Sequence, residues 1–247
     1  MLVWSRLSLY YSKQKHNRQY AHIKWDYWRC VINLSMRNPV VIFGASTLGR
    51  AAKEIFENNE VVVYGFLDDT KALHGKEIDT VTVLGATDDD GFLKLIGKKC
   101  EAFVAVDENR LRRSLVKMLH EKRKVQPVNA IHGSALVPGS VHLGHGNFLD
   151  MGVKVGAGAQ IGNHTLIHAG AIIGSESSVG DFVQIGMGSL INAGVKIEEE
   201  VFIGSGVTVV SGVTIGKGAR VGAGAVVIAS VKEGETVFGN PAQVVKA

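Results

Sequence analysis

Aliphatic residues recur at every sixth position between Val137 and Val227. A period of six matches neither an α-helix, which repeats about every 3.6 residues, nor a strand, which alternates. It is typical of a short strand followed by a corner, repeated many times. Glycine often follows the aliphatic residue, as at Gly156 and Gly174, and allows a corner backbone that a Cβ atom would obstruct. The register runs unbroken through Val137, Leu143, Leu149, Val155, Ile161, Ile167, Ile173, Val179, Ile185, Ile191, Ile197, Ile203, Val209, Ile215, Val221 and Val227.

This repeat predicts a parallel β-helix with a narrow aliphatic core. Three repeats close one triangular coil, so equivalent residues of successive coils stack on the same face, roughly 4.8 Å apart. The whole run gives about five coils. A flexible glycine-rich linker is the alternative, and it is disfavoured because the aliphatic register never shifts.

The chain before the repeat alternates strands and helices. Residues 40–43 form a continuous apolar run, which predicts a buried parallel strand. Further strands are expected at 61–67, near 81–84 and at 102–106, and helices at 50–57, 88–98 and 108–121. On the last helix we expect one apolar face, formed by Leu111, Leu115, Met118 and Leu119, and a solvated basic face, formed by Arg110, Arg112, Arg113, Lys122 and Lys124.

A glycine turn joins the first strand to the first helix. Gly44, Ala45 and Ser46 open this turn, and such a strand, turn and helix begin a nucleotide-binding βαβ unit in which the helix N-terminus faces a phosphate. Asp68 and Asp69 end the second strand, where an acid can meet a ribose hydroxyl. A solvated turn or a helix cap explains these two acids equally well.

Charge is concentrated at the N-terminus. The 247 residues carry a net charge of +4, yet residues 1–37 hold seven Lys and Arg against the single acid Asp26. The remaining chain is slightly acidic, so we expect no nucleic-acid partner. No run is long and apolar enough for a membrane span. We interpret residues 1–37 as an extension that is disordered or not native; a surface arm for a membrane or partner is the alternative.

Cysteine and histidine spacing predict no metal site. Cys30 and Cys100 stand alone, without metal or redox spacing, and fit a reducing cytoplasm. His142, His145 and His164 are expected at corners of the β-helix, and no pair of them has zinc-site spacing.

The order of these segments resembles that of the bacterial sugar acyltransferases. A Rossmann-like domain (38–127), the linker Ile131-His132 and a hexapeptide β-helix domain (128–247) with Gly239-Asn240-Pro241-Ala242 near its end carry the resemblance. The family includes sialic acid O-acetyltransferases and UDP-amino-sugar N-acetyltransferases. It implies a left-handed β-helix, homotrimers, acetyl-CoA between neighbouring β-helices, and a nucleotide sugar on the N-terminal domain. It also implies catalysis by a histidine that takes a proton from the acceptor, next to a glutamate.

The chain departs from the family pattern at the catalytic position. Ser175 replaces the catalytic histidine, and Gln184 replaces a second histidine near acetyl-CoA, while Glu176 matches the glutamate. In the N-terminal domain Asn109 and Arg112 match the family and are expected to contact substrate with Gly44, Ala45, Ser46, Asp68 and Asp69. Other departures are Thr47-Leu48, where the family has Gly-His, and Asp107, where it has Gly.

His168 is the candidate replacement base. It stands at a position where the family has Asn, and Asp150, 18 residues earlier, is expected to stack beside it. An adjacent acid orients a histidine and raises its pKa, so we expect Asp150 or Glu176 to support His168. The alternative is a surface histidine at a β-helix corner.

The later coils carry the predicted acetyl-CoA site. Small residues there leave room for a pantetheine arm, and with Gln184 we expect Gly204, Ser205, Gly222 and Ala223 to bind it. The sequence therefore predicts an acetyl-CoA-dependent transferase acting on the amine or hydroxyl of a nucleotide-linked sugar in surface-glycan synthesis. A non-catalytic trimeric β-helix that binds a nucleotide sugar or a partner protein is the alternative, because Ser175 cannot act as a base at neutral pH.

Overall fold

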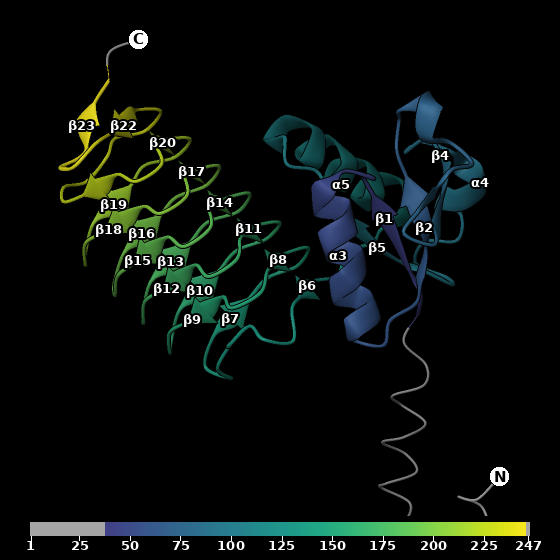
Figure 1. Cartoon of the computed structure of the whole chain (residues 1–247), viewed down its shortest axis with the longest axis horizontal. Coiled ribbons are helices and arrows are strands. Elements are labelled where there is room, and N and C mark those ends of the chain that lie inside the picture. Colours follow the sequence, from purple (N-terminus) through teal and green to yellow (C-terminus); the bar gives the residue numbers. More distant parts are fainter. Residues whose placement is uncertain (1–37, 246–247) are drawn as a thin grey trace, which may run out of the picture. The chain divides into compact units, whose positions relative to one another are not determined.

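The computed structural model describes residues 38–245, and the predicted extension, residues 1–37, lies outside them. Within this range an α/β domain is followed by a left-handed parallel β-helix, as predicted (Figure 1). No helix in the described range is long and apolar enough to cross a membrane.

Strand β1 (Val40–Phe43) lies inside the sheet of the α/β domain, because all four of its residues are apolar and buried. It pairs in parallel with β2 (Val63–Leu67) on one side and with β5 (Glu101–Val104) on the other. The full order is β3-β4-β2-β1-β5, with β3 (Glu77–Ile78) and β4 (Val81–Gly85) at one edge. After β1, the chain adds β2, β3 and β4 on one side of β1 and then β5 on the other side. The carboxyl ends of β1 and β5 therefore form a topological switch point.

Helices α3 (Thr47–Asn58) and α5 (Asn109–Arg123) cover opposite faces of this sheet. Alternate residues of β1 point to opposite faces, so Ile42 packs in one cluster with α3 and Phe43 packs in the other with α5. Each helix buries an apolar stripe, which in α5 includes Leu115. The alternation of strands and helices in the sequence is therefore enough to explain the layers.

The structure differs from the sequence expectations at several places in this domain. The helix expected over 88–98 is only α4 (Asp90–Leu93), because the chain turns at Gly97, which has φ +77° and whose N–H bonds to the Cys100 carbonyl at 2.8 Å. A short 3-10 helix, η1 (Lys71–Leu73), was not expected. On α5, Leu111 is 42% exposed, because its place on the buried stripe is taken by Arg112.

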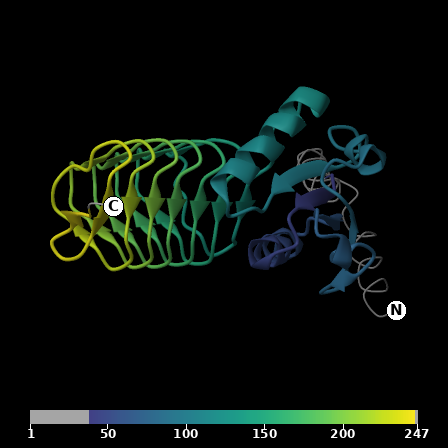
Figure 2. The ribbon, with the colours of Figure 1, turned by 90° about the horizontal axis from the view of Figure 1, so that it is seen from above.

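The β-helix confirms the six-residue register. Its coils stack on one another along the domain (Figure 2). The strands are mostly two residues long, and residues 18 positions apart pair in parallel, as Leu166 does with Gln184. The second residue of each short strand points inward, so Ile167, Ile185 and Ile203 are fully buried in the core.

Three faces run along the coils, and we call them the docking face, the apolar face and the polar face. The docking face comprises β6 (Ala130–Ile131), β8 (Phe148–Leu149), β11 (Leu166–Ile167), β14 (Gln184–Ile185), β17 (Phe202–Ile203), β20 (Arg220–Val221), β22 (Thr236–Phe238) and β23 (Gln243–Val244). The apolar face comprises β9 (Lys154–Val155), β12 (Ile172–Ile173), β15 (Leu190–Ile191), β18 (Thr208–Val209) and β21 (Val226–Val227). The polar face comprises β7 (His142–Leu143), β10 (Gln160–Ile161), β13 (Ser178–Val179), β16 (Lys196–Ile197) and β19 (Thr214–Ile215).

Three corners separate the faces. The histidine corner joins the docking and apolar faces and contains residues 150–152, 168–170, 186–188, 204–206 and 222–224. The serine corner joins the apolar and polar faces and contains residues 157–158, 175–176, 193–194 and 211–212. The helix corner joins the polar and docking faces and contains residues 144–146, 162–164, 180–182, 198–200 and 216–218.

The first coils of the docking face pack against the α/β domain. Phe148 and Leu166 point outward from β8 and β11, yet both are fully buried in a cluster with Ala45 and Ala105. These alanines follow β1 and β5, so the cluster places the carboxyl ends of those strands against the β-helix. The amide of Asn109, at the start of α5, also donates to the carbonyl of Phe182 at 3.0 Å. The fold thereby brings the switch point next to the coil that carries His168.

Candidate active site

The loops that follow β1 and β5 lie in contact at the switch point. Gly44 has φ +104°, and a Cβ atom on it would stand 2.5 Å from the carbonyl oxygen of Ala105, so only glycine permits this approach. Ser46 precedes α3 without capping it through its side chain, which leaves the first amide groups of the helix without that partner. Ligands of open parallel sheets bind in such a crevice. The predicted substrate residues Gly44, Ala45 and Ser46 all belong to this loop.

The two aspartates after β2 hold neighbouring loops together. Asp68 accepts hydrogen bonds from the backbone of Ala45 at 2.9 Å and of Thr70 at 2.8 Å. Burial disfavours the ionised form of Asp68, but these hydrogen bonds outweigh it and lower its pKa. Asp69 accepts from the backbone and the hydroxyl of Thr87, both at 2.9 Å. Both carboxylates hold the loops of the switch point in place, and their contact with a ribose stays a prediction.

Arg112 corrects the prediction of a wholly solvated basic face on α5. Its side chain is fully buried, and Nη1 donates to the carbonyls of Val106 at 2.7 Å and Asp107 at 3.0 Å. Nη2 donates to the side chain of Asn109. Burial lowers the pKa of Arg112 to about 10, which still leaves it charged at neutral pH. Arg112 and Asn109 therefore fix the loop after β5, which accounts for both residues without a direct substrate contact.

His168 lies beside the outward residues of the docking face. Its Nε2 is 3.3 Å from the amide nitrogen of Gln184, and its ring centroid is 6.0 Å from that of Phe148. Asp150 occupies the same corner one coil earlier, and its backbone N–H donates to the Ile167 carbonyl at 3.0 Å. The structure thus places His168 and Asp150 on successive coils of the histidine corner, with Gln184 of the docking face in contact with His168.

The charge state of His168 is set by burial and by nearby charges. Burial lowers its pKa below the ordinary value of 6.5; Asp107 and Asp150 act to raise the pKa, and Arg112 acts to lower it. The net shift is downward, so the imidazole is neutral at pH 7 and can accept a proton.

The structure does not bring Glu176 to His168 within one chain. Glu176 and Ser175 lie on the serine corner, at the far side of the apolar face from His168. Both are exposed, and Glu176 has φ +56°, while its backbone N–H donates to the Ala157 carbonyl at 3.0 Å. Nearness along the sequence was misleading here, because strand β12 separates the two corners.

Four of the five residues predicted for acetyl-CoA share the histidine corner with His168, and the fifth, Gln184, lies on the adjoining docking face. His168, Gly186, Gly204 and Gly222 stack on successive coils, because the inward residues that precede them pair in one ladder. Ser205 and Ala223 follow on the exposed side of the corner. The predicted donor residues and the candidate base therefore form one continuous strip.

Comparisons with known proteins point to one family. The model of the PglD N-terminal domain matches residues 39–119, and that of the bacterial transferase hexapeptide (six repeats) matches 140–175, 176–211 and 194–229. No curated protein matches the chain.

Solved structures agree over nearly their whole length. A point mutant of perosamine N-acetyltransferase from Caulobacter crescentus, in complex with CoA and GDP-perosamine, is 30% identical, with a TM-score of 0.79 over 86% of this chain and 99% of that one. The acetyltransferase domain of PglB from Neisseria gonorrhoeae FA1090, in complex with acetyl coenzyme A, is 25% identical, with a TM-score of 0.77 over 85% and 100%. WeeI from Acinetobacter baumannii AYE is 26% identical, with a TM-score of 0.75 over 84% and 99%.

This chain belongs to the sugar acyltransferases of the hexapeptide-repeat superfamily.

Sequence reasoning did not connect Asp107 with His168. Asp107 was noted only as a departure from a family glycine, yet it acts electrostatically on His168. The signal that could have found it is its position two residues beyond Ala105, directly after a predicted parallel strand.

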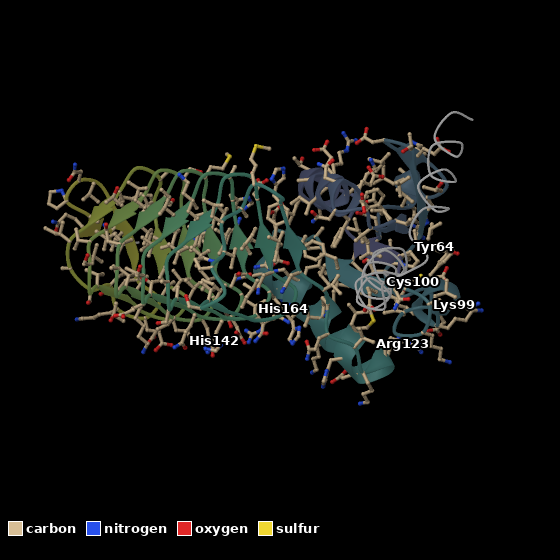
Figure 3. The ribbon with its side chains drawn as sticks, turned by 90° about the horizontal axis from the view of Figure 1, so that it is seen from below. Tyr64, Lys99, Cys100, Arg123, His142 and His164 are labelled. Carbon is tan, nitrogen blue, oxygen red and sulfur yellow. The ribbon has the colours of Figure 1, made fainter. Side chains whose placement is uncertain are left out.

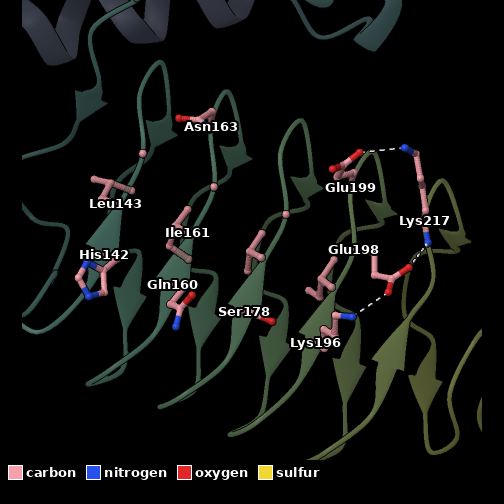
Figure 4. Close-up of a pocket in the computed structure, with 15 residues that line it drawn as sticks. His142, Leu143, Gln160, Ile161, Asn163, Ser178, Lys196, Glu198, Glu199 and Lys217 are labelled. Atoms are coloured by element: carbon pink, nitrogen blue, oxygen red, sulfur yellow. Dashed lines mark hydrogen bonds and ion pairs between the residues drawn. The ribbon is translucent and has the colours of Figure 1, made fainter.

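Two hollows of the acyltransferase lie away from the histidine corner. One runs along the polar face, where His142, Gln160, Ser178 and Lys196 follow one another on successive strands (Figure 4). The other lies between α5 and the helix corner and is lined by residues that include Arg110, Lys117, His120, His164 and Phe182. Neither hollow contains a predicted catalytic residue.

His164 makes the acyltransferase sensitive to acid. It lies on the first coils (Figure 3), is 5% exposed, and its Nδ1 has no hydrogen-bond partner among the described residues. Burial lowers its pKa to about 4, although Asp181 opposes the shift. The unfolded chain therefore binds a proton that the folded chain excludes between pH 6.5 and about 4, and stability falls as the pH falls through this window.

We expect the free energy of unfolding to fall by about 3 kcal/mol from pH 7 to pH 4 through His164 alone. Urea denaturation at both pH values, in wild type and His164→Gln, measures this contribution as the difference between the two pH dependences. His142→Gln, at an exposed position on the polar face, is the control and should keep the wild-type dependence. An equal pH dependence in wild type and His164→Gln would contradict the assignment.

Proposed function

We propose that this acyltransferase moves the acetyl group of acetyl-CoA to the amine of a nucleotide-linked amino sugar. The observation that carries the proposal is the meeting of the switch-point crevice with His168 and Gln184. Leu166, two residues before His168, packs in one cluster with the residues that follow β1 and β5. The perosamine N-acetyltransferase complex, with its CoA and GDP-perosamine, supports both substrate classes.

The histidine corner fits the acyl donor. Every left-handed position along it is glycine, and a Cβ atom built on Gly188, Gly206 or Gly224 would meet nothing within 4 Å. The corner therefore presents bare backbone along which a pantetheine arm could lie. Arg220, whose guanidinium lies 4.6 Å from the ring centroid of Phe202, offers a cation for phosphates on the adjoining docking face. When bound there, acetyl-CoA supplies the acetyl group as a thioester.

We assign His168 as the general base. Because its pKa is lowered by burial, the neutral ring can take a proton from the acceptor amine as the amine attacks. The Gln184 amide lies against Nε2, and the acceptor would take that place. Gln184 is then free to donate to the thioester oxygen, on which negative charge develops. Asp150 stabilises the imidazolium from the preceding coil.

We also propose that three copies assemble through the apolar face. Ile172 and Leu190 on this face are 37% and 43% exposed, and Met187 at its edge is 58% exposed. Three such faces turned toward one axis would bury these side chains. The histidine corner of one copy would then meet the serine corner of the next, because these corners flank the apolar face. Glu176 of the partner subunit could thereby support His168, which Glu176 of the same chain cannot reach.

Leu190→Lys should dissociate the assembly, because it places three charges against one another in an apolar interface. Light scattering should give three times the chain mass for wild type and a lower mass for the variant. Gln160→Lys adds the same charge on the polar face and should leave the mass unchanged. A wild type that is monomeric would contradict the assembly.

A non-catalytic β-helix is the second candidate, and one observation favours it. Ser175, at the family's catalytic position, is exposed, and the residues that make up its serine corner include no histidine. This candidate predicts binding of a nucleotide sugar or a partner without turnover.

Release of CoA from acetyl-CoA separates the two candidates. The full chain is incubated with acetyl-CoA and one acceptor at a time: GDP-perosamine, a series of UDP-amino-sugars, and sialic acid. Acceptor-dependent release supports the transferase, and release only with sialic acid would change the acceptor group to a hydroxyl. Binding of a nucleotide sugar without release supports the non-catalytic β-helix. Failure to bind acetyl-CoA would overturn the transferase.

A further inference from the structure

The hollow between α5 and the helix corner lies across the docking face from the histidine corner. It has a volume of about 600 Å³, which is within the range of small-molecule sites. None of the residues assigned above to acetyl transfer lines it. The side chains that α5 contributes are spaced by three or four residues, and therefore share one face of the helix. They are Arg110, Arg113, Ser114, Lys117 and His120.

The α5 side of the hollow carries positive charge that is only partly neutralised. Arg113 forms an ion pair with Glu200 of the helix corner. Arg110 is exposed and forms no ion pair among residues 38–245. Lys117 reaches Glu121 only at 3.8 Å, and both side chains are well exposed, so this pair is weak. Arg110 and Lys117 are therefore two cations available to an anion in the hollow.

The carboxylate that lines the hollow does not balance these cations. It belongs to Asp181, on the helix corner. Its Oδ1 accepts hydrogen bonds from the backbone of Asn163 at 2.7 Å and from the side-chain amide of Asn163 at 3.1 Å. Asp181 is thus already used to join two successive coils.

His164 presents an unused hydrogen-bonding group on the opposite wall of the hollow. The residue is 5% exposed, and its ring centroid lies 4.9 Å from that of Phe182. Its Nδ1 is packed against Gly146, and neither ring nitrogen has a hydrogen-bond partner among the described residues. A buried polar group without a partner is destabilising, and a bound ligand that supplies the partner would remove that cost.

The helix corner holds these rings in a backbone conformation that disfavours side chains. His164 and Phe182 have φ of +57° and +58°, whereas the equivalent positions of the histidine corner are all glycine. Such positions are costly for residues other than glycine and occur often at binding sites. The two rings therefore form a fixed wall that faces the cations of α5.

The remaining lining is suited to an organic molecule rather than to a bare anion. Ser114 and Gln126 line the hollow, and their side chains make no hydrogen bond within residues 38–245. Phe182 and Val116 add apolar surface to the same hollow. Two cations, unpartnered polar groups and apolar surface together match a ligand that has a phosphoryl group and a larger polar body.

We propose that this hollow binds a small organic phosphate, either a sugar phosphate or a nucleotide, at a site separate from that of acetyl transfer. Arg110 and Lys117 hold the phosphoryl oxygens, which are the preferred acceptors of such cations. Ser114, Gln126 and His164 donate to or accept from the polar body. The site does not depend on the proposed acetyl transfer, because the two share no residue.

The test is an NMR titration of the full chain with ¹³C-labelled histidine rings. The probes are ribose 5-phosphate, UDP and inorganic phosphate, each added alone. The ring signal of His164 reports on the hollow and that of His168 on the site of acetyl transfer, and each is assigned through its absence in His164→Gln or His168→Ala.

The His164 signal should move with at least one of the two organic phosphates, and the one that binds more tightly identifies the class of ligand. Inorganic phosphate should bind about tenfold more weakly or less, because it lacks the polar body. Movement of the His168 signal without that of His164 would place binding at the site of acetyl transfer and overturn the inference. So would equal affinity for inorganic phosphate, or no movement with any probe.

Two variants on α5 separate a built site from general charge attraction. Lys117→Gln should weaken binding of the organic phosphate about tenfold, because a charge-assisted hydrogen bond is lost. Lys122→Gln removes the same charge from an exposed position of the same helix outside the hollow, and should leave the affinity unchanged. Equal weakening in the two variants would show that only the net charge of the helix matters, and would overturn the inference.

Discussion

Replacement of His168 by alanine should reduce acetyl transfer about 10²- to 10⁴-fold, the usual contribution of a general base. Acetyl-CoA binding should persist, because the corner glycines that accommodate the donor are unchanged. CoA release measured under saturating substrates, with donor affinity measured by calorimetry, separates the two quantities. His142→Ala, an exposed histidine on the polar face, should retain wild-type activity.

The pH dependence of wild-type transfer provides a second test of His168 as the general base. Burial holds the pKa of His168 below 6.5, and only the neutral ring accepts a proton. The rate should therefore be near its maximum at pH 7 and fall as the pH drops through a value below 6.5. Undiminished turnover in His168→Ala would exclude His168 as the base and would direct attention to a residue of the serine corner.

Replacement of Arg112 by methionine should lower the free energy of unfolding by about 1–3 kcal/mol, because the hydrogen bonds that the guanidinium donates would be lost. Methionine has a similar length but no donors, so the carbonyls of Val106 and Asp107 would lose the donor that Arg112 provides. The loop that faces His168 would lose its support at the same time. We therefore expect lower transfer activity as well as lower stability.

Urea denaturation of Arg112→Met and Arg110→Met provides the matched comparison. Arg110 lies on the same helix but is exposed, and its loss should cost less than about 0.5 kcal/mol. Equal stabilities for the two variants would show that the buried guanidinium contributes no net stability to the junction of the domains.

The β-helix could be predicted almost completely from the sequence. The inward positions such as Ile167, Ile185 and Ile203 must be apolar on every coil, so the six-residue spacing of apolar residues predicts the β-helix directly. The α/β domain was predicted less well. Asp88 to Lys98 looked helical, but Gly97 turns the chain and leaves only α4. A short helix competes closely with turns, and its length is decided by local hydrogen bonds that composition does not reveal.

The candidate site could be predicted only in part. The stacking of Asp150 near His168 followed from the 18-residue coil, and so did the alignment of Gly204 and Gly222 with His168. Arg112 was grouped with the other basic residues of its helix on a solvated face, because arginine and lysine side chains are usually exposed. Its burial depends on carbonyl groups of a loop that lies beyond the helix.

The sequence by itself determined the repeat, the three-sided coil and the residues that share each corner, because these depend on a fixed period. Tertiary structure alone decided which face of the β-helix packs against the α/β domain, and therefore which side chains surround His168. Glu176 is eight residues from His168 in the sequence but lies on the serine corner, across the apolar face. Asp107 is 61 residues away in the sequence, yet its charge acts to raise the pKa of His168. Electrostatic partners are set by distance in space, and the docking of two domains creates distances that no local pattern contains.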